Sequence, residues 1–414
     1  MQSLSPLLLN GKESADNDKN KLKPMETPTR IAQHRSHFHS RKTSRLRALY
    51  VWIFILAMYG NGQAAEPHPK QTIAELAQKA LDEGKTDLAL TLYAKAVKQT
   101  PGWTEGWWRY GGLLYETRQY PAAKQAFARL TTLAPNNSLG FALLGLCEYE
   151  EQDWNNATLH LNKSLNRGSL PAEISQSAAY HLGLSLMRLR DRDGALLILK
   201  LLLHQAPEYP GLSLAIGAAE LEMQTAPSLD DALFQAAILA GEGTVSVARI
   251  KAEDAEKSYR QLVTRFPNLP YAHICFGEFL EYEHRDDEAA QEFRAETQVS
   301  PDNPVAWIWL GRVAVVQQDA STARAAAQRA LALDPSNPLA YLIEGRGFML
   351  EHRWEQAVDP LIEAEKRVPN SSEVHFALAS TYAALHRSEA AAAERKLFLE
   401  TSEPEGGAEG SHNR

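Results

Sequence analysis

The sequence predicts an all-α chain built from about nine copies of a two-helix unit. Alanine follows a recurring small residue by twelve positions in eight of nine cases, and a proline often closes the unit, as at Pro135 and Pro335. A fixed period of this length is typical of stacked repeats, so most of the chain is expected to be a scaffold whose function lies on its surface. The small residues are spaced mostly by 34: Ala77, Gly111, Gly145, Gly183, Gly217, Gly277, Gly311, Gly345 and Ala379.

The residue types in this period suit two antiparallel helices that approach closely. Glycine or alanine at position 8 and alanine at position 20 keep the helix axes at the usual distance of about 8–10 Å. Proline at position 32 ends the second helix and sets the turn to the next unit. Two units show the pattern in full: Trp107, Tyr110, Gly111, Ala123, Phe127 and Pro135 in one, Trp307, Leu310, Gly311, Ala323, Ala327 and Pro335 in the other.

This pattern resembles the tetratricopeptide repeat (TPR) family over roughly residues 70–403. The resemblance implies a right-handed superhelical solenoid of helix-turn-helix units. Four surplus residues near Pro171 separate the third unit from the fourth. We expect units to begin near Lys70, Thr104, Ser138, Gln176, Pro210, Pro270, Pro304, Pro338 and Ser372, all within a solenoid at 66–403.

The fifth unit is expected to be interrupted. Sixty residues separate Pro210 from Pro270 where 34 are expected, so about 26 are inserted, and the alanine partner of Gly217 is displaced to Ala255. We place the insert at 224–249, with a helix that starts near Ser228 and stops at the glycines of Gly241-Glu242-Gly243. It is either an extra helix packed over the joint or an arm that contacts a partner.

The termini predict export. Residues 1–47 carry ten Lys/Arg against four Asp/Glu and are expected to be a basic disordered leader. The uncharged run 48–59 and the small residues up to Ala65 are typical of a signal peptide, with a retained membrane anchor as the alternative, so 48–65 is assigned to one of these. Either places the body outside the cytoplasm, periplasmic or extracellular. Residues 404–414 are expected to be a disordered tail.

The charge and the motifs of the sequence limit the classes of function that the protein can have. Outside the leader, 33 Lys/Arg stand against 47 Asp/Glu, which argues against a nucleic-acid partner. No complete catalytic or phosphate-binding motif and no metal-ligand spacing occurs, so no enzyme activity, cofactor or metal is expected. The two cysteines, Cys147 and Cys275, lie in different repeats and are expected to be buried small hydrophobes.

The TPR resemblance implies that positions 2, 5, 9, 12 and 13 of each first helix face a concave groove. Arg312 and Arg346 occupy position 9 of consecutive units, where they would hold a carboxylate or form a salt-bridge ladder with Glu278 and Glu281. Aromatic residues with a few charges suit an extended peptide or a partner helix. The groove candidates are Trp108, Tyr115, Tyr149, Tyr180, Tyr271, Tyr282, Arg312 and Arg346.

The sequence therefore predicts a non-enzymatic scaffold that binds a protein or peptide partner in its concave groove. One alternative is an envelope-assembly or secretion accessory tethered to a membrane through 48–59. A further alternative is an enzyme, or the regulatory subunit of one, with a site near the insert.

Overall fold

The computed structural model describes residues 71–167 and 170–402. They belong to a compact unit that spans Pro67–Arg414. The leader predicted at 1–47, the signal peptide or anchor predicted at 48–65 and the tail predicted at 404–414 lie outside the described residues. None of the helices in the described ranges combines the length and the apolar character that a membrane span requires.

All regular secondary structure in the described ranges is helical, and it comprises 19 helices. In chain order they are α2 Gln71–Asp82, α3 Thr86–Gln99, α4 Thr104–Glu116, α5 Tyr120–Leu133, α6 Ser138–Glu150, α7 Trp154–Leu165, α8 Ala172–Arg188, α9 Arg192–Gln205, α10 Leu212–Glu220, α11 Phe234–Ala248, α12 Ala252–Arg265, α13 Ala272–Tyr282, α14 Asp286–Val299, α15 Pro304–Val316, α16 Ala320–Leu333, α17 Pro338–Leu350, α18 Trp354–Arg367, α19 Ser372–Ala384 and α20 Ser388–Ser402.

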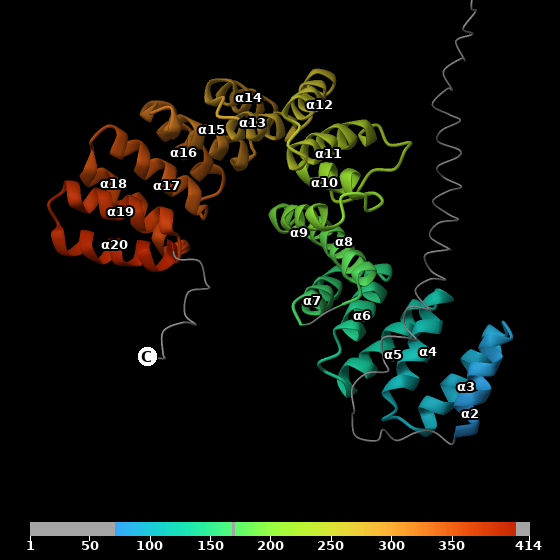
Figure 1. Ribbon diagram of the computed structural model, residues 1–414. Coiled ribbons are helices and arrows are strands. Elements are labelled where there is room, and N and C mark those ends of the chain that lie inside the picture. Colours follow the sequence, from blue (N-terminus) through green and yellow to red (C-terminus); the bar gives the residue numbers. More distant parts are fainter. Residues whose placement is uncertain (1–70, 168–169, 403–414) are drawn as a thin grey trace, which may run out of the picture. The chain divides into compact units, whose positions relative to one another are not determined.

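Each helix packs against its neighbours in the chain, as Figure 1 shows from α2 to α20. Within most units the position-8 glycine lies directly against the residue sixteen positions later, whereas Gly311 lies against Ile343 of the next unit. A Cβ added to Gly111 would come within 2.8 Å of the Phe127 ring, and one added to Gly345 within 2.6 Å of Leu361. The predicted reason for the small residue is confirmed: any larger side chain would push the two helices apart.

A second recurring feature marks the turn between the two helices of a unit. Seven residues after the small residue, the backbone adopts a left-handed conformation, with φ near +60° in the non-glycine cases. This conformation reverses the chain after the first helix. It occurs at Gly84, Arg118, Gln152, Arg190, Ile250, His284, Gln318, His352 and His386.

The fifth unit follows this register from Gly243, not from Gly217. Ile250 takes the left-handed turn seven residues after Gly243, Ala255 follows Gly243 by twelve, and a Cβ on Gly243 would meet the Tyr259 ring at 2.5 Å. Helices α11 and α12 therefore form a regular unit, and α10 is a single helix between units. The nine units that we predicted are present in number, but one was assigned to the wrong glycine.

The surplus 26 residues therefore lie at 210–235, where they form α10, the loop after it and the first two residues of α11, and not at 224–249. The expectation that Gly241 and Gly243 end a helix is also wrong, because α11 runs through both. Gly217 packs on the α11 backbone at Ala237 and Gly241, and Gly243 packs on Tyr259. Without side chains at these glycines the neighbouring helices approach closely, and this packing outweighs the low helix propensity of Gly241 and Gly243 within α11.

The surplus near Pro171 is absorbed differently. Helix α8 has 17 residues, whereas first helices such as α6 and α15 have 13. Four residues amount to about one turn, so α8 gains a turn without a change of the face that packs on its neighbours.

Consecutive units are joined by a recurring hydrogen bond. The polar tip of the large residue at position 4 donates to the carbonyl of the proline six residues earlier. Trp107 and Trp307 donate through Nε1 at 2.9 Å, Tyr341 donates through its hydroxyl at 3.2 Å, and His273 and His375 use Nε2 at 3.1 and 2.8 Å. In these five units position 4 combines a large side chain with a donor at its end. Other units have no donor at this position, as at Ile73 and Phe141.

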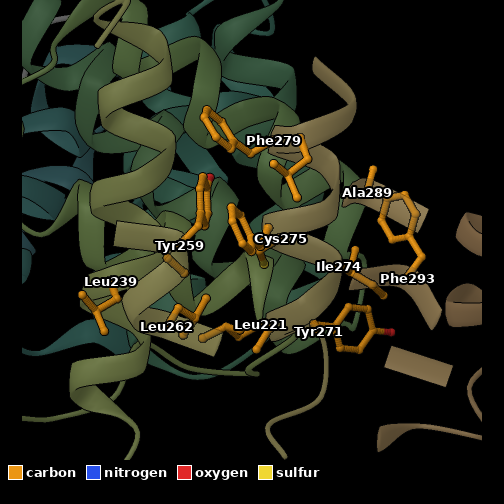
Figure 2. Packing of buried hydrophobic residues seen from close by; sticks show 14 of the residues in the cluster. Leu221, Leu239, Tyr259, Leu262, Tyr271, Ile274, Cys275, Phe279, Ala289 and Phe293 are labelled. Atoms are coloured by element: carbon orange, nitrogen blue, oxygen red, sulfur yellow. The ribbon is translucent and has the colours of Figure 1, made fainter. Parts of the chain in front are cut away.

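The largest buried cluster lies where α10 meets the following helices. Figure 2 shows Leu221 after α10, Leu239 of α11, Tyr259 of α12 and Phe279 of α13 around a shared core. Cys275 is buried in this cluster, and Cys147 is buried in another. Both thiols are free, as the sequence predicted.

Candidate functional site

Four first helices of consecutive units, α13, α15, α17 and α19, touch one another in series. Their outward positions carry large apolar side chains that the fold leaves exposed. Tyr282 is 67% exposed, Val316 55%, Leu339 45% and Phe376 51%. We call the outward positions of these four helices the first-helix face. One exposed apolar side chain per helix gives this face a repeated apolar contact point, and groups of such side chains are typical of protein-binding surfaces.

The charges on the first-helix face are arranged in pairs between units. Arg312 Nη2 lies 3.5 Å from Glu281 Oε1 of the preceding unit. Arg346 Nη1 lies 2.6 Å from Glu373 Oε1 of the following unit. Each guanidinium is thus matched to a carboxylate on the neighbouring first helix, which agrees with the predicted ladder in the case of Glu281.

Glu278, the other carboxylate of that predicted ladder, takes a different partner. Its Oε1 lies 3.6 Å from Nη2 of Arg192 on α9. Burial raises the pKa of the Glu278 carboxyl, and the Arg192 guanidinium opposes that rise. Arg192 also donates from Nε to the Glu220 carbonyl at 3.3 Å and lies over the Tyr271 ring, 5.4 Å from its centroid. It therefore connects α9, α10 and α13.

The two arginines keep part of their binding capacity. Arg312 is 45% exposed in its side chain and stacks 4.4 Å from the centroid of the Trp309 ring. A guanidinium has five N–H donors, and a single carboxylate uses at most two of them. Because the pairs with Glu281 and Glu373 are partly in solvent, each contributes about 0–1 kcal/mol to stability, so exchange with a partner's carboxylate costs little.

The aromatic candidates in the first half of the chain are half-buried among other rings. Trp108 meets Phe127 edge-on at 6.1 Å between centroids, and Tyr115 meets Tyr120 at 5.4 Å. Such edge-to-face pairs fix the neighbouring helices. Each ring still has a solvent-facing part, because none of these side chains is fully buried.

The next two candidates pack in the same way. Tyr149 contacts His181 at 4.7 Å between centroids, and Tyr180 contacts Tyr209 at 5.0 Å. Burial raises the pKa of both phenols, so they remain neutral hydrogen-bonding groups. Tyr271, in contrast, is buried to 6% exposure. Of the predicted aromatic residues, Tyr282 is thus the one that the fold leaves most exposed.

A buried polar cluster, which sequence reasoning missed, lies between helices α9, α10, α11 and α12. Thr244 of α11 donates to Glu220 of α10, and its oxygen lies 3.0 Å from the Tyr259 hydroxyl of α12. Lys200 of α9 lies 3.4 Å from Glu220 Oε1. The cluster gives Glu220 Oε1 a hydrogen bond and a cation where the single helix α10 enters the stack, while Glu220 Oε2 is buried without a hydrogen-bond partner. No spacing in the sequence indicates it, because its members come from four helices.

Sequence reasoning also missed Val316, Leu339 and Phe376 on the first-helix face. A usable signal exists: the three side chains occupy groove positions 13, 2 and 5 of their units. A single sequence, however, does not distinguish an exposed aliphatic residue at these positions from one that is buried in the core. Only the packing shows that they are exposed while Ile308 at the equivalent position 5 of its unit is buried.

The paired helices with a small residue at each crossing define the class of the protein, a helical-repeat solenoid. Two family models described as tetratricopeptide repeat match residues 80–147 and 280–338. Both ranges therefore contain tetratricopeptide repeats, so the predicted resemblance and the predicted helical-repeat fold class are confirmed. Proteins of this architecture are interaction scaffolds with extended binding surfaces.

Solved structures that resemble the chain include MamA and P58(IPK). A MamA protein is 17% identical over 40% of this chain and 91% of its own, with a TM-score of 0.37. MamA 41-end from Desulfovibrio magneticus RS-1 is 16% identical over 42% and 98%, with a TM-score of 0.38. The P58(IPK) TPR domain is 14% identical over 77% and 99%, with a TM-score of 0.28. No curated protein matches the chain.

Proposed function

We propose that the chain is a non-enzymatic scaffold that binds an extended peptide or a helix along the first-helix face of α13, α15, α17 and α19. The observation that supports this most directly is the row of exposed Tyr282, Val316, Leu339 and Phe376, one on each helix. One exposed apolar side chain on each of four consecutive first helices offers a series of contacts to a partner that crosses these helices, although the side chains occupy different positions of their units.

The partner is expected to carry carboxylates between apolar side chains. Arg312 and Arg346 would exchange their present carboxylates, Glu281 and Glu373, for those of the partner. An arginine anchor beside aromatic contacts is typical of the few residues that supply most of the affinity at an interface. This arrangement favours an acidic amphipathic segment over a basic one.

Affinity capture of partners with variants tests this function. Tyr282→Ala, Arg312→Ala and Phe376→Ala together should reduce partner binding by about 100-fold or more, since each hot-spot truncation costs at least about 1 kcal/mol. The matched control is the pair Leu197→Ala and Leu201→Ala on the second helix α9, whose side chains are 60% and 49% exposed. Equal loss in both variants, or loss in neither, would contradict binding on the first-helix face.

We also propose that the solenoid functions outside the cytoplasm. The basic residues before Ala48, the short apolar run 48–59 and the small residues up to Ala65 support export. N-terminal sequencing of the protein isolated from its source distinguishes the two forms. A mature chain that starts at Ala65 supports a cleaved signal peptide, whereas a retained 48–59 segment supports the alternative of a membrane-tethered accessory protein.

A further inference from the structure

Three potential ligand atoms converge at the C-terminal end of the described solenoid. His375 of α19 is 1% exposed. Its Nδ1 lies 2.8 Å from Glu394 Oε2 of α20 and 3.8 Å from Glu365 Oε1 of α18. One atom from each residue falls within 4.8 Å of the others. Three helices thus direct one nitrogen and two oxygens towards a common point.

The other ring nitrogen of His375 is already committed. Nε2 donates to the Pro369 carbonyl at 2.8 Å. Nδ1 in turn lies 2.8 Å from Glu394 Oε2, so without a metal ion it donates a hydrogen bond to that carboxylate. Loss of the Nδ1 proton would free its lone pair for a cation while Nε2–H stays on the carbonyl. A backbone carbonyl that holds the far N–H of a histidine is the common way in which proteins orient a metal-binding imidazole.

The charge of the group is unbalanced without a cation. Glu365 and Glu394 place two carboxylates beside the same imidazole in a partly buried space. A proton on His375 neutralises only one of the two negative charges. A divalent cation neutralises both, and it replaces the proton at Nδ1.

The chain holds a natural comparison for this site. His273 occupies the same position 4 in its unit as His375. Its Nδ1 lies 2.6 Å from Glu292 and its Nε2 lies 3.1 Å from the Pro267 carbonyl, so both hydrogen bonds are reproduced. The place that corresponds to Glu365 is occupied by Val263. The histidine–glutamate–proline arrangement is therefore a structural feature of the repeat, and the third ligand is the addition at His375.

We propose that Glu365, His375 and Glu394 bind one divalent metal ion of the zinc class. A mixed set of imidazole and carboxylate ligands suits Zn²⁺ and its neighbours Co²⁺ and Ni²⁺. Mg²⁺ and Ca²⁺ prefer ligand sets made of oxygen alone. Three protein ligands leave at least one coordination position for water.

The position of the site in the fold suggests its effect. Helix α20 packs on α19, and the described residues contain no further helix beyond it. In a repeat protein each unit depends on its neighbours, so an end unit loses stabilising contacts on one side. An ion shared by α18, α19 and α20 would fasten α20 to the two helices before it.

Titration of the full chain with Zn²⁺ against a chromophoric chelator tests the proposal. Glu365→Val copies the residue that the chain itself uses at Val263, and Glu365→Gln is a second variant that keeps the size of the side chain. Glu355→Val, at an exposed position of the same helix, is the matched control. Because histidines elsewhere in the chain also bind zinc, the readout is the difference between variants.

We expect the unmodified chain and Glu355→Val to bind one more equivalent of Zn²⁺ than both Glu365 variants, or to bind it at least about tenfold more tightly. Zn²⁺ should also raise the melting temperature of the unmodified chain more than that of the variants, because an ion that binds the folded state stabilises it. Mg²⁺ should produce neither difference. Equal stoichiometry, affinity and melting shift in the unmodified chain and both Glu365 variants would overturn the proposal.

Discussion

Ile250 illustrates how strongly the unit imposes its backbone on a single residue. It is a β-branched residue with φ +57°, a conformation that such residues rarely adopt, and it is 95% exposed. No contact of its side chain explains the conformation. The turn that follows every first helix requires it, and the same turn takes glycine at Gly84 with φ +72°.

Ile250→Gly is expected to stabilise the protein by about 0.5–1 kcal/mol. Relief of the left-handed strain, about 1–2 kcal/mol, exceeds the entropy that glycine loses on folding. Chemical denaturation measures the change. The reverse substitution, Gly84→Ala, should destabilise by a similar amount, and Ile250→Ala should change little because it stays left-handed. Destabilisation by Ile250→Gly would show that the turn is not strained.

His273 shows how the packing of a unit changes the pKa of a single side chain. Burial alone would lower the pKa of its imidazole, but the hydrogen bonds to Glu292 and to the Pro267 carbonyl outweigh burial and raise the pKa overall. The protonated form is therefore favoured in the folded state. This stabilisation is complete below the ordinary pKa of histidine and is lost as the pH rises through the folded-state pKa.

An NMR titration of the His273 ring should therefore give a pKa above the ordinary histidine value of about 6.5. Glu292→Gln should lower that pKa, and its destabilising effect should be larger at pH 5 than at pH 9. Glu288→Gln, which removes a carboxylate paired with Arg285, serves as the control and should leave the His273 titration unchanged. An unchanged pKa in Glu292→Gln would rule out the ion pair as the cause.

At the scale of the element, the single helix α10 shows what helix packing adds to the repeat. Helix α11 packs against α10 on one side and α12 on another, so it acts as the second helix for α10 and as the first helix of the fifth unit. Two glycines allow this: Gly217 of α10 faces the α11 backbone, and Gly243 of α11 faces the Tyr259 ring. The join is as closely packed as a regular unit.

Gly217→Ala should lower the free energy of unfolding by about 3 kcal/mol or more. Its Cβ would overlap the Ala237 carbonyl and the Gly241 nitrogen, and backbone atoms cannot move aside as side chains do. The matched control is Gly112→Ala in α4, where the new Cβ meets no atom within 4 Å. That substitution should stabilise by about 0.5–1 kcal/mol, since alanine is the better helix former. Denaturation midpoints, with hydrogen exchange in α10 and α11, measure both effects, and a neutral Gly217→Ala would contradict the close packing.

At the scale of the whole molecule, similarity between units explains both the success and the error of the sequence prediction. The 34-residue period identifies the two-helix unit, the family and the number of units, because each unit repeats the same small residue, alanine and proline for the same packing reason. The position of the 26 surplus residues is ambiguous in the sequence. Gly217 and Gly243 both fit position 8 of the fifth unit. If Gly217 is chosen, the 26 surplus residues follow the glycine, and if Gly243 is chosen, they precede it. Both choices give the neighbouring units the same 34-residue spacing.

The proposed interaction surface also depends partly on the repeat register and partly on the tertiary packing. The repeat register identifies which side chains share a face, and Arg312, Arg346 and Tyr282 follow from it. The register does not say which members are exposed, since Tyr271 and Ile308 are buried while Val316 and Phe376 lie open. Exposure depends on the sizes of the side chains on adjacent helices, which come from different units.

By itself, the sequence determined the all-α repeat architecture. Each close contact between paired helices requires a small residue, so the spacing of the small residues gives the period of the repeat. Only the tertiary structure decided that α10 is the additional helix, that Arg192, Glu220 and Thr244 meet at its joint, and that Glu365, His375 and Glu394 converge on one point. The physical reason is that each of these features depends on individual side chains that depart from the repeated pattern, such as Glu365 where the corresponding residue of another unit is Val263. Their side chains meet through close contact of neighbouring helices, and no spacing along the chain records such a meeting.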